Sequence, residues 1–164
     1  MNAKLVYLDT SSIVKRYIEE KGSQVVDVVY AKAESGELRF TFSIWNIGET
    51  FGVFDRYASK GFLTNDALKT ALLDFISEST KMVRLGSLQI LPMTMKSIVE
   101  SWMLVIKHHI YQADALQIST SREVKCDLLL SADQRLIQVA ENEGIKAINI
   151  EAQPEKALAL VGKA

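Results

Sequence analysis

The stretch that most constrains the fold is an apolar run, residues 5–8 (L-V-Y-L), that ends abruptly at Asp9 and continues through Thr10 into a helical pattern. This order predicts a β-strand, a carboxylate at its carboxyl end and the start of a helix. Ligands of open α/β sheets bind outside the carboxyl ends of the strands, so Asp9 is a candidate site residue. Asp is also a preferred N-cap residue, and Asp9 could serve only to cap the helix. The choice depends on whether other acids converge on it.

The rest of the chain repeats this alternation of short strands and longer helices. Hairpin turn signals are absent, which favours crossover connections and a parallel sheet with helices on both faces. We therefore expect an α/β protein, a three-layer α/β/α sandwich with a central parallel sheet. A single domain is expected over residues 1–150, with a short C-terminal helix over residues 151–164 that packs on it. The expected strands are 5–8, 38–42, 89–92, 127–130 and 146–150, and the expected helices are one that ends near residue 20, then 25–35, 44–59, 65–82, 94–108, 111–124, 133–142 and one that begins at Pro154.

Composition and charge exclude several classes of protein. The chain is 48% hydrophobic, yet no apolar run reaches the roughly 18 residues that a membrane helix needs. The first residues lack the basic and apolar regions of a signal peptide, which favours a cytoplasmic protein. The single cysteine, Cys126, lies beside an apolar run, where we expect a buried hydrophobic residue rather than a disulfide or a thiolate metal ligand. With a net charge of −1, a nucleic-acid partner would have to be held by local basic residues.

Two further acids stand inside apolar rows of the predicted helices. Glu49 is four residues from both Trp45 and Val53, and Asp114 has an isoleucine at the same spacing on either side. Residues four apart share one face of a helix, so neither acid lies on the polar face where a solvated carboxylate is expected. Both are therefore candidate site residues.

Asp133 follows the predicted strand 127–130 in the same way that Asp9 follows the first strand. The residues from Ser131 to Gln134 also form a passable capping box, S-x-x-Q, in which Asp133 would only favour the helix dipole. The residues alone leave both interpretations of Asp133 open.

A cluster of these four acids would need a cation. Carboxylates within about 5 Å repel by about 3 kcal/mol per pair at an effective dielectric constant of 20. The six pairs together exceed the stability of a typical domain, roughly 5–15 kcal/mol, so a cation or protons must be present. Ligands that are all oxygen select hard divalent ions, and a site shared with a phosphate suits Mg²⁺ or Mn²⁺. Zinc is not expected, because His108 and His109 face different ways on a helix and have no cysteine nearby.

Four short motifs surround the acids: Y-L-D-T-S at Asp9, N-I-G-E-T at Glu49, Q-A-D-A-L-Q-I at Asp114 and L-L-S-A-D-Q-R-L at Asp133. Their order, spacing and placement resemble the PIN domain family and, more closely, its VapC-type toxin branch. The resemblance covers nearly the whole chain. The separation between Glu49 and Asp114 is long for a small toxin, which predicts an elaborated helix at residues 64–82.

The resemblance implies a Mg²⁺- or Mn²⁺-dependent endoribonuclease that hydrolyses RNA phosphodiester bonds and acts as the toxin of a type II toxin–antitoxin pair. The four acids would be both catalytic and metal-binding. Asp9 and Asp114 would be the principal ligands, Glu49 a ligand directly or through water, and Asp133 a more variable fourth acid. Family members commonly form homodimers and are inhibited by a small antitoxin protein whose basic tail enters the acidic site.

Side chains near the acids would support the substrate, which the resemblance implies is single-stranded or structured RNA. Ser131 and Thr10 would provide auxiliary hydrogen bonds. Lys15, Arg16 and Arg135 are candidate contacts of RNA phosphates. Arg135 is the first to test, because it begins the helix beside Asp133.

The same residues allow two other functions. The first is a PIN-like regulatory module that holds a metal or a partner protein without cleaving RNA. The presence of all four acids argues against it, since a degenerate site would be expected to lose one. The second is a phosphotransfer enzyme with an aspartyl nucleophile on the first strand. Asp9 has neither the D-x-D start nor the paired acids that such enzymes use, so a metal-dependent nuclease is favoured.

Overall fold

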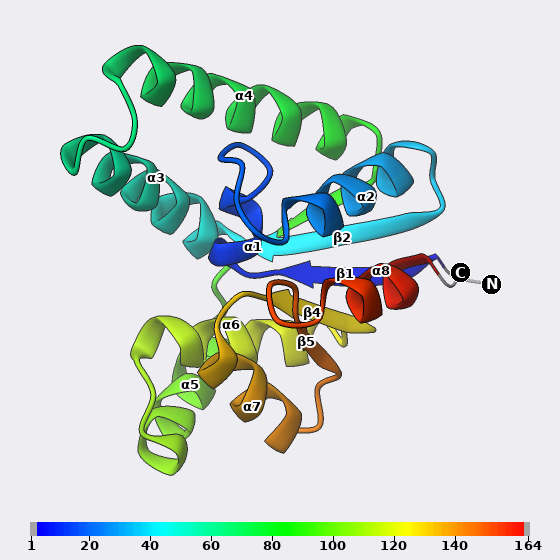
Figure 1. Cartoon of the computed structure of the whole chain (residues 1–164). Helices are drawn as coiled ribbons and strands as arrows, with labels where there is room; N and C mark the ends of the chain where they lie inside the picture. The colour runs from blue at the N-terminus through cyan, green and yellow to red at the C-terminus, as the bar shows by residue number, and fades with distance from the viewer. Residues whose placement is uncertain (1–2, 163–164) are drawn as a thin grey trace.

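A computed structural model describes residues 3–162, which form a five-stranded sheet with helices on both faces (Figure 1). All neighbouring strands are parallel, and their order in the sheet is β3-β2-β1-β4-β5. The strands are β1 (Lys4–Leu8), β2 (Leu38–Ser43), β3 (Leu88–Leu91), β4 (Leu128–Ser131) and β5 (Ala147–Asn149). The three-layer α/β/α fold that the alternation predicts is confirmed.

The helices cover the two faces of the sheet in chain order. In Figure 1, α1 to α4 lie above the sheet and α5 to α7 lie below it, while α8 packs against α2. The helices are α1 (Thr10–Val14), α2 (Ser23–Glu34), α3 (Ile44–Ser59), α4 (Asn65–Arg84), α5 (Met95–His108), α6 (Gln112–Glu123), α7 (Gln134–Asn142) and α8 (Pro154–Gly162). Within residues 3–162, none of them has the length and apolar character needed to cross a membrane.

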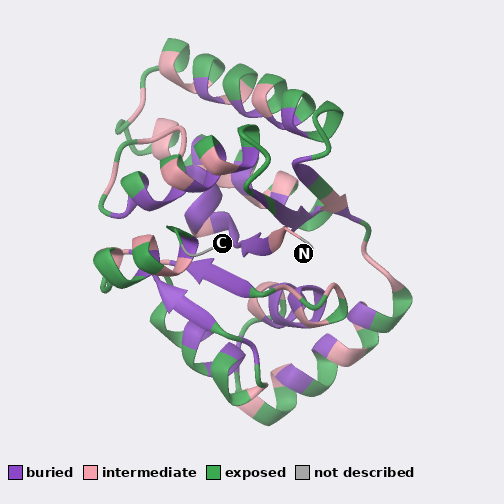
Figure 2. Ribbon diagram, turned by 90° about the vertical axis from the view of Figure 1, so that its right-hand side faces the viewer, coloured by how far each residue is buried: buried purple, intermediate pink, exposed green. Residues whose placement is uncertain are grey.

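The sheet separates two hydrophobic cores. Successive side chains of a strand point to opposite faces, and in β1 Val6 and Leu8 enter one core while Tyr7 enters the other. Tyr7 is paired with Leu129 of β4, which lies in the same core. The central strands are buried on both faces (Figure 2), which is why they read as continuous apolar runs rather than alternating patterns.

The first helix is much shorter than expected. The pattern predicts a helix that ends near residue 20, whereas α1 ends at Val14 and the chain continues in turns. The difference follows from the next residue. The ammonium group of Lys15 is buried between the carboxylates of Glu20 and Glu151, at 2.7 and 2.5 Å, and this long-range contact overrides local helix propensity.

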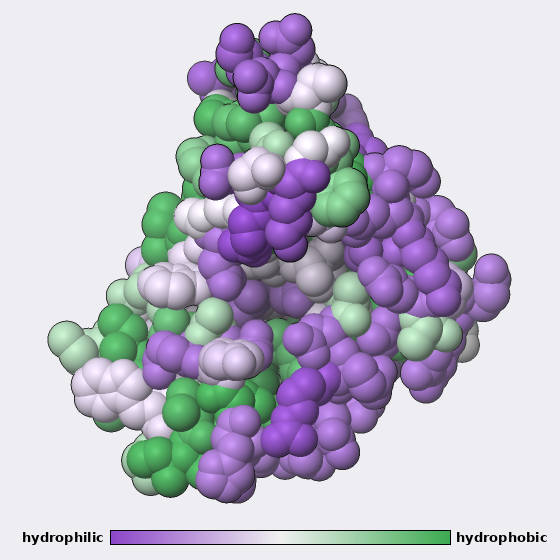
Figure 3. Space-filling model, turned by 60° about the vertical axis from the view of Figure 1, so that its left-hand side comes forward, coloured by the Kyte–Doolittle hydropathy of each residue, from purple (hydrophilic) through white to green (hydrophobic). Residues whose placement is uncertain are grey.

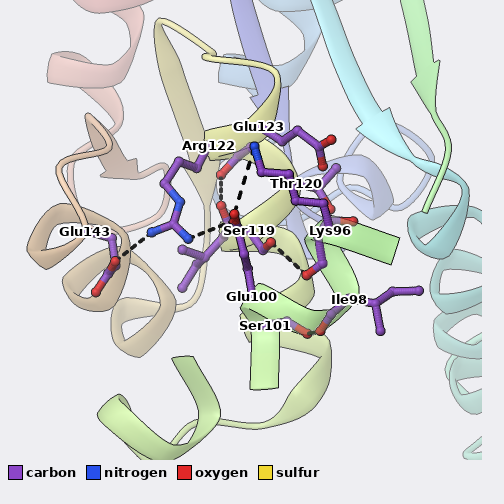
Figure 4. Close-up of polar contacts among 12 residues, drawn as sticks. Lys96, Ile98, Glu100, Ser101, Ser119, Thr120, Arg122, Glu123 and Glu143 are labelled. Atoms are coloured by element: carbon purple, nitrogen blue, oxygen red, sulfur yellow. Dashed lines mark hydrogen bonds and ion pairs between the residues drawn. The ribbon is translucent and has the colours of Figure 1, made fainter. Parts of the chain in front are cut away.

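Ion pairs connect the three helices below the sheet. The guanidinium of Arg122 on α6 donates to Glu100 on α5 at 3.0 Å and to Glu143, just after α7, at 2.8 Å (Figure 4). Glu143 also accepts hydrogen bonds from Lys107 and His108 at the end of α5, at 2.7 and 2.6 Å. These two bonds lower the pKa of Glu143, because they stabilise its charged form. The ion pairs therefore hold α6, which carries one of the predicted site acids, against its neighbours.

Candidate active site

A pocket of about 660 Å³ is lined by all four predicted acids. Each acid comes from a different element: Asp9 follows β1, Glu49 lies in α3, Asp114 lies in the first turn of α6 and Asp133 precedes α7. The pocket lies at the carboxyl edge of the sheet, where the strand order reverses between β1 and β4, and this is the usual ligand site of such sheets. Figure 3 shows this side of the molecule, which is hollowed and has hydrophilic residues across its middle.

Asp9 is the most deeply buried of the four acids, with 3% of its surface exposed. Its carboxylate accepts hydrogen bonds from the Ser11 hydroxyl at 2.7 Å, the Ser12 backbone N–H at 2.8 Å and the Ser131 hydroxyl at 2.6 Å. Burial raises the pKa of Asp9, and these donors oppose the rise by stabilising the charged form. Asp9 is thus both the N-cap of α1 and a member of the pocket, so its capping and functional interpretations are compatible.

Glu49 is held by two donors from other elements. Its Oε2 accepts from the Thr10 hydroxyl at 2.8 Å and from the Gln117 side-chain amide at 3.1 Å. The amide of the buried residue Asn46 donates to both of these partners, at 3.0 Å to Thr10 and 2.8 Å to Gln117, and its oxygen accepts from Tyr7 at 3.1 Å. A buried network that is satisfied in this way fixes the position of each member.

Asn46 and Gln117 are two helix residues of this network that the sequence analysis did not predict. Each is a polar residue one helical turn from a predicted acid, Asn46 before Glu49 and Gln117 after Asp114. That spacing was the available signal, because residues three apart on a helix lie on neighbouring positions of one face.

The apolar row around Glu49 has a different role from the one expected. Trp45 and Val53 flank Glu49 as the spacing predicts, but they line the pocket together with it. The row of α3 that is buried in the protein is Asn46, Thr50 and Phe54. The acid therefore stands in the wall of the pocket and not in the core.

Asp133 is exposed and serves as the N-cap of α7. Its Oδ1 accepts from the backbone N–H groups of Arg135 at 2.7 Å and Leu136 at 3.1 Å. Ser131 is not the cap. Its hydroxyl accepts from the Asp133 N–H at 2.9 Å and donates to Asp9, so it connects the two acids that follow β1 and β4.

Asp114 is half-buried, and its pKa is raised to about 6. Burial is the largest cause, and the negative charges of Asp133, Asp9 and Glu49 raise the pKa further. The charges of the other three predicted acids therefore act together at Asp114, which is the arrangement expected of a site for a cation or a proton.

The candidate phosphate contacts lie in different places. Lys15 lines the pocket, but its ammonium is paired with Glu20 and Glu151. Arg16 binds Asp27 and Glu78, and it is not among the described residues that line this pocket. Arg135 also lies outside that lining.

The Arg135 guanidinium donates to the backbone carbonyl of His108 at 2.6 Å. This contact holds the end of α5 close to the start of α7. Arg135 therefore connects two helices near the acids. Its contact with an RNA phosphate stays a prediction.

The donor chemistry of the pocket fits a hard divalent ion, since the four acids offer only oxygen atoms. Within residues 3–162, however, no three acidic, histidine or cysteine side chains are already arranged to hold an ion together. Three of the acids are held by contacts within the protein, and Glu49 accepts from Thr10 and Gln117 as described above. The Asp9 oxygens accept hydrogen bonds from three donors, and one Asp133 oxygen caps α7. Cys126 is a free, half-buried thiol with a pKa raised to about 12, chiefly by burial, and it does not line the pocket that the structure describes.

Comparison with known proteins agrees with this geometry. A family model described as "PIN domain" matches residues 6–142. No curated protein matches the sequence significantly.

The solved structures that are similar in fold include three from different organisms. VapC20 from Mycobacterium tuberculosis, a sarcin-ricin loop cleaving toxin, has a TM-score of 0.60 and 14% identity, over 88% of this chain and 98% of that chain. PAE2754 from Pyrobaculum aerophilum has a TM-score of 0.58 and 16% identity, over 97% of this chain and 99% of that chain. FitAcB from Neisseria gonorrhoeae has a TM-score of 0.58 and 17% identity, over 88% of this chain and 97% of that chain.

The raised pKa of Asp114 predicts how stability depends on pH without metal. An acid whose pKa rises on folding, here from 3.8 to about 6, adds stability below pH 3.8 that is lost as the pH rises through 6. We expect Asp114→Asn to remove this loss and to raise the free energy of unfolding at pH 7.5 by about 1–3 kcal/mol. Urea unfolding in EDTA at pH 5 and pH 7.5 measures the effect.

The matched control is Asp55→Asn, which changes an exposed acid of α3 outside the pocket and should leave the pH dependence as it is. An unchanged pH dependence in Asp114→Asn would show that the carboxyl group ionises normally.

Proposed function

The chain belongs to the PIN domain family, and on this basis we propose that it is a Mg²⁺- or Mn²⁺-dependent endoribonuclease that hydrolyses RNA phosphodiester bonds. The observation that carries the proposal is the convergence of Asp9, Glu49, Asp114 and Asp133 on one pocket from four separate elements. Capping explains an acid after a strand and the helix dipole favours Asp114 in the first turn of α6, but neither explains Glu49, which lies inside α3 and in the wall of the pocket.

In the proposed site, Asp9, Glu49, Asp114 and Asp133 would hold the metal ion. A bound ion of this kind lowers the pKa of a water molecule and stabilises negative charge on a phosphodiester. Other residues of the chain fix the positions of these metal-binding carboxylates. Ser11 and Ser131 orient the Asp9 carboxylate, and Thr10 and Gln117 orient that of Glu49. Outer partners of this type matter for metal affinity, because they fix the direction in which each ligand points.

We further propose that the protein is the toxin of a toxin–antitoxin pair. The likeness in fold to VapC20 and FitAcB supports this proposal. The charge of the pocket supports a basic partner segment, because among residues 3–162 six carboxylates and only two cationic side chains line it. A small antitoxin with a basic segment would complement this charge.

A homodimer is also part of the proposal. One face of α5 exposes five apolar side chains at helical spacing: Met95, Val99, Trp102, Met103 and Ile106. In Figure 3, hydrophobic residues gather below the hollow, where α5 lies in Figure 1. A continuous exposed apolar surface of this kind is typical of a protein–protein interface.

The first prediction concerns cleavage. We expect the protein to cleave single-stranded RNA with Mn²⁺ or Mg²⁺ and not with EDTA. Glu49→Gln and Asp114→Asn should fold but lose at least about a hundredfold in rate, because they remove metal-binding charge. Gel-based cleavage and thermal unfolding measure the two effects. Metal binding without any cleavage by the parent protein would instead support the regulatory module.

The second prediction concerns Asp133, which is both a helix cap and a pocket residue. Asn caps a helix about as well as Asp, so Asp133→Asn should change stability without metal by no more than about 0.5 kcal/mol. If Asp133 is also a metal-site acid, the same variant should bind Mn²⁺ more weakly and cleave RNA more slowly. Full cleavage would leave a three-acid site of Asp9, Glu49 and Asp114.

The third prediction concerns the homodimer. A charge at the centre of the apolar face of α5, introduced by Met103→Glu, should shift the protein from dimer to monomer in sedimentation velocity. Leu73→Glu is the matched control, since Leu73 is similarly exposed on α4, at 67% against 64% for Met103. A monomeric parent protein would contradict the proposed homodimer.

A further inference from the structure

One face of α3 forms a wall of the pocket and carries an unusual sequence of side chains. Seven residues of this helix line the pocket, and they recur at spacings of one, three and four, so they share a single face: Trp45, Gly48, Glu49, Gly52, Val53, Arg56 and Tyr57. An indole ring stands at one end of this face, a guanidinium at the other, and the site acid Glu49 between them. The ends are about 16 Å apart along the helix axis.

Trp45 is not explained by the packing of the protein. It is 42% exposed, it belongs to neither hydrophobic core, and no ring contact or hydrogen bond joins its indole to another residue within 3–162. It also lines a pocket that contains six carboxylates. The part of the indole that stays open to water contributes nothing to folding, and an exposed aromatic ring is the kind of group on which an unpaired base stacks.

Arg56 is not explained by ion pairing. It is exposed, it lines the pocket, and its guanidinium makes no hydrogen bond or ion pair with another residue in the described part of the chain. The other cation of the pocket, Lys15, is neutralised by Glu20 and Glu151. Arg56 is therefore the pocket cation that is available to a phosphate group.

The two glycines between these ends leave the helix backbone bare. A Cβ atom added at Gly48 would meet nothing within 4 Å, and one added at Gly52 would meet only the Arg56 side chain, at 3.6 Å. Packing within the chain does not require either glycine, although glycine inside a helix costs about 1 kcal/mol relative to alanine. Beside Trp45 and Arg56, this bare surface gives a bound strand room to lie close to the helix.

We propose that this face of α3 binds one unpaired strand of the RNA substrate, with a base stacked on Trp45 and a phosphate of the strand bound by Arg56. The proposal rests on the proposed ribonuclease function and adds the residues that select the form of the substrate. A base can stack on Trp45 only when its face is free, so the surface selects single strands and loops over a continuous duplex.

The chain offers a direct test, because it contains two tryptophans, Trp45 and Trp102. Trp102 lies on α5, outside the lining of the pocket. In an Asp114→Asn background that prevents cleavage, Trp102→Phe leaves Trp45 as the single fluorophore. We expect its emission to change when a single-stranded oligoribonucleotide is added, and to change far less with the same strand annealed to its complement. The matched protein, with Trp45→Phe in place of Trp102→Phe, should show no response.

Affinity measurements test the two ends of the face separately. Trp45→Ala should weaken binding of the single strand about 5- to 150-fold, the range expected for one stacked base, and Trp45→Phe should retain most of the affinity. Arg56→Ala should weaken binding. It should also reduce the slope of log affinity against log salt concentration by about 1, the value expected for the loss of one phosphate contact. Arg84→Ala is the control, since Arg84 is exposed on α4 outside this pocket.

The outcomes separate this proposal from the ribonuclease function itself. If the parent protein cleaves RNA but Trp45→Ala and Arg56→Ala bind and cleave like the parent, the strand-binding role of α3 is wrong and the nuclease function stands. Equal responses to single strand and duplex would also overturn it. If the parent neither binds nor cleaves RNA, both proposals fail. Thermal unfolding of each variant shows whether a loss of binding reflects a loss of folding.

Discussion

The burial of the Asp9 carboxylate is the constraint on which the rest of the structure depends. An ionised carboxylate in a protein interior costs several kcal/mol unless hydrogen bonds replace its water. Two of its donors, Ser11 and Ser12, lie in α1, which follows β1 directly, but the third, Ser131, is the last residue of β4. The Asp9 carboxylate can therefore receive all three hydrogen-bond donors only when β1 and β4 are neighbours in the observed register. The hydrogen bonds of Asp9 and the order of the strands consequently depend on each other.

The network around Glu49 extends this requirement to α3 and α6. Glu49 depends on Thr10, which follows Asp9 directly, and on Gln117 of α6. Asn46 connects both partners to Tyr7 in β1, so the helices on opposite faces of the sheet are joined at its carboxyl edge. A half-satisfied network of buried polar groups would cost stability, which makes the relative positions of these elements specific.

The order of strands and helices could be predicted because apolar runs and helical spacing are local properties of the sequence. The positions of Asp9 and Asp133 could be predicted for the same reason, because each acid follows the end of an apolar run that forms a strand. The early end of α1 could not be predicted, since it depends on the distant pairing of Lys15 with Glu151. Nor does spacing show which face of α3 is buried, because its buried row begins with the polar residue Asn46. Such features are set by tertiary packing, which overrides local preference.

The long separation between Glu49 and Asp114 has a structural counterpart in α3 and α4. These helices have 16 and 20 residues, whereas the strands have between three and six, so the helix pair extends well beyond the sheet (Figure 1). A helix that only covered the sheet would end within a few turns of Glu49. Because α3 continues to Ser59, Arg56 and the glycines before it become part of the pocket wall. The extra length of α3 therefore builds a surface beside the acids without altering the strand ends that hold Asp9 and Asp133.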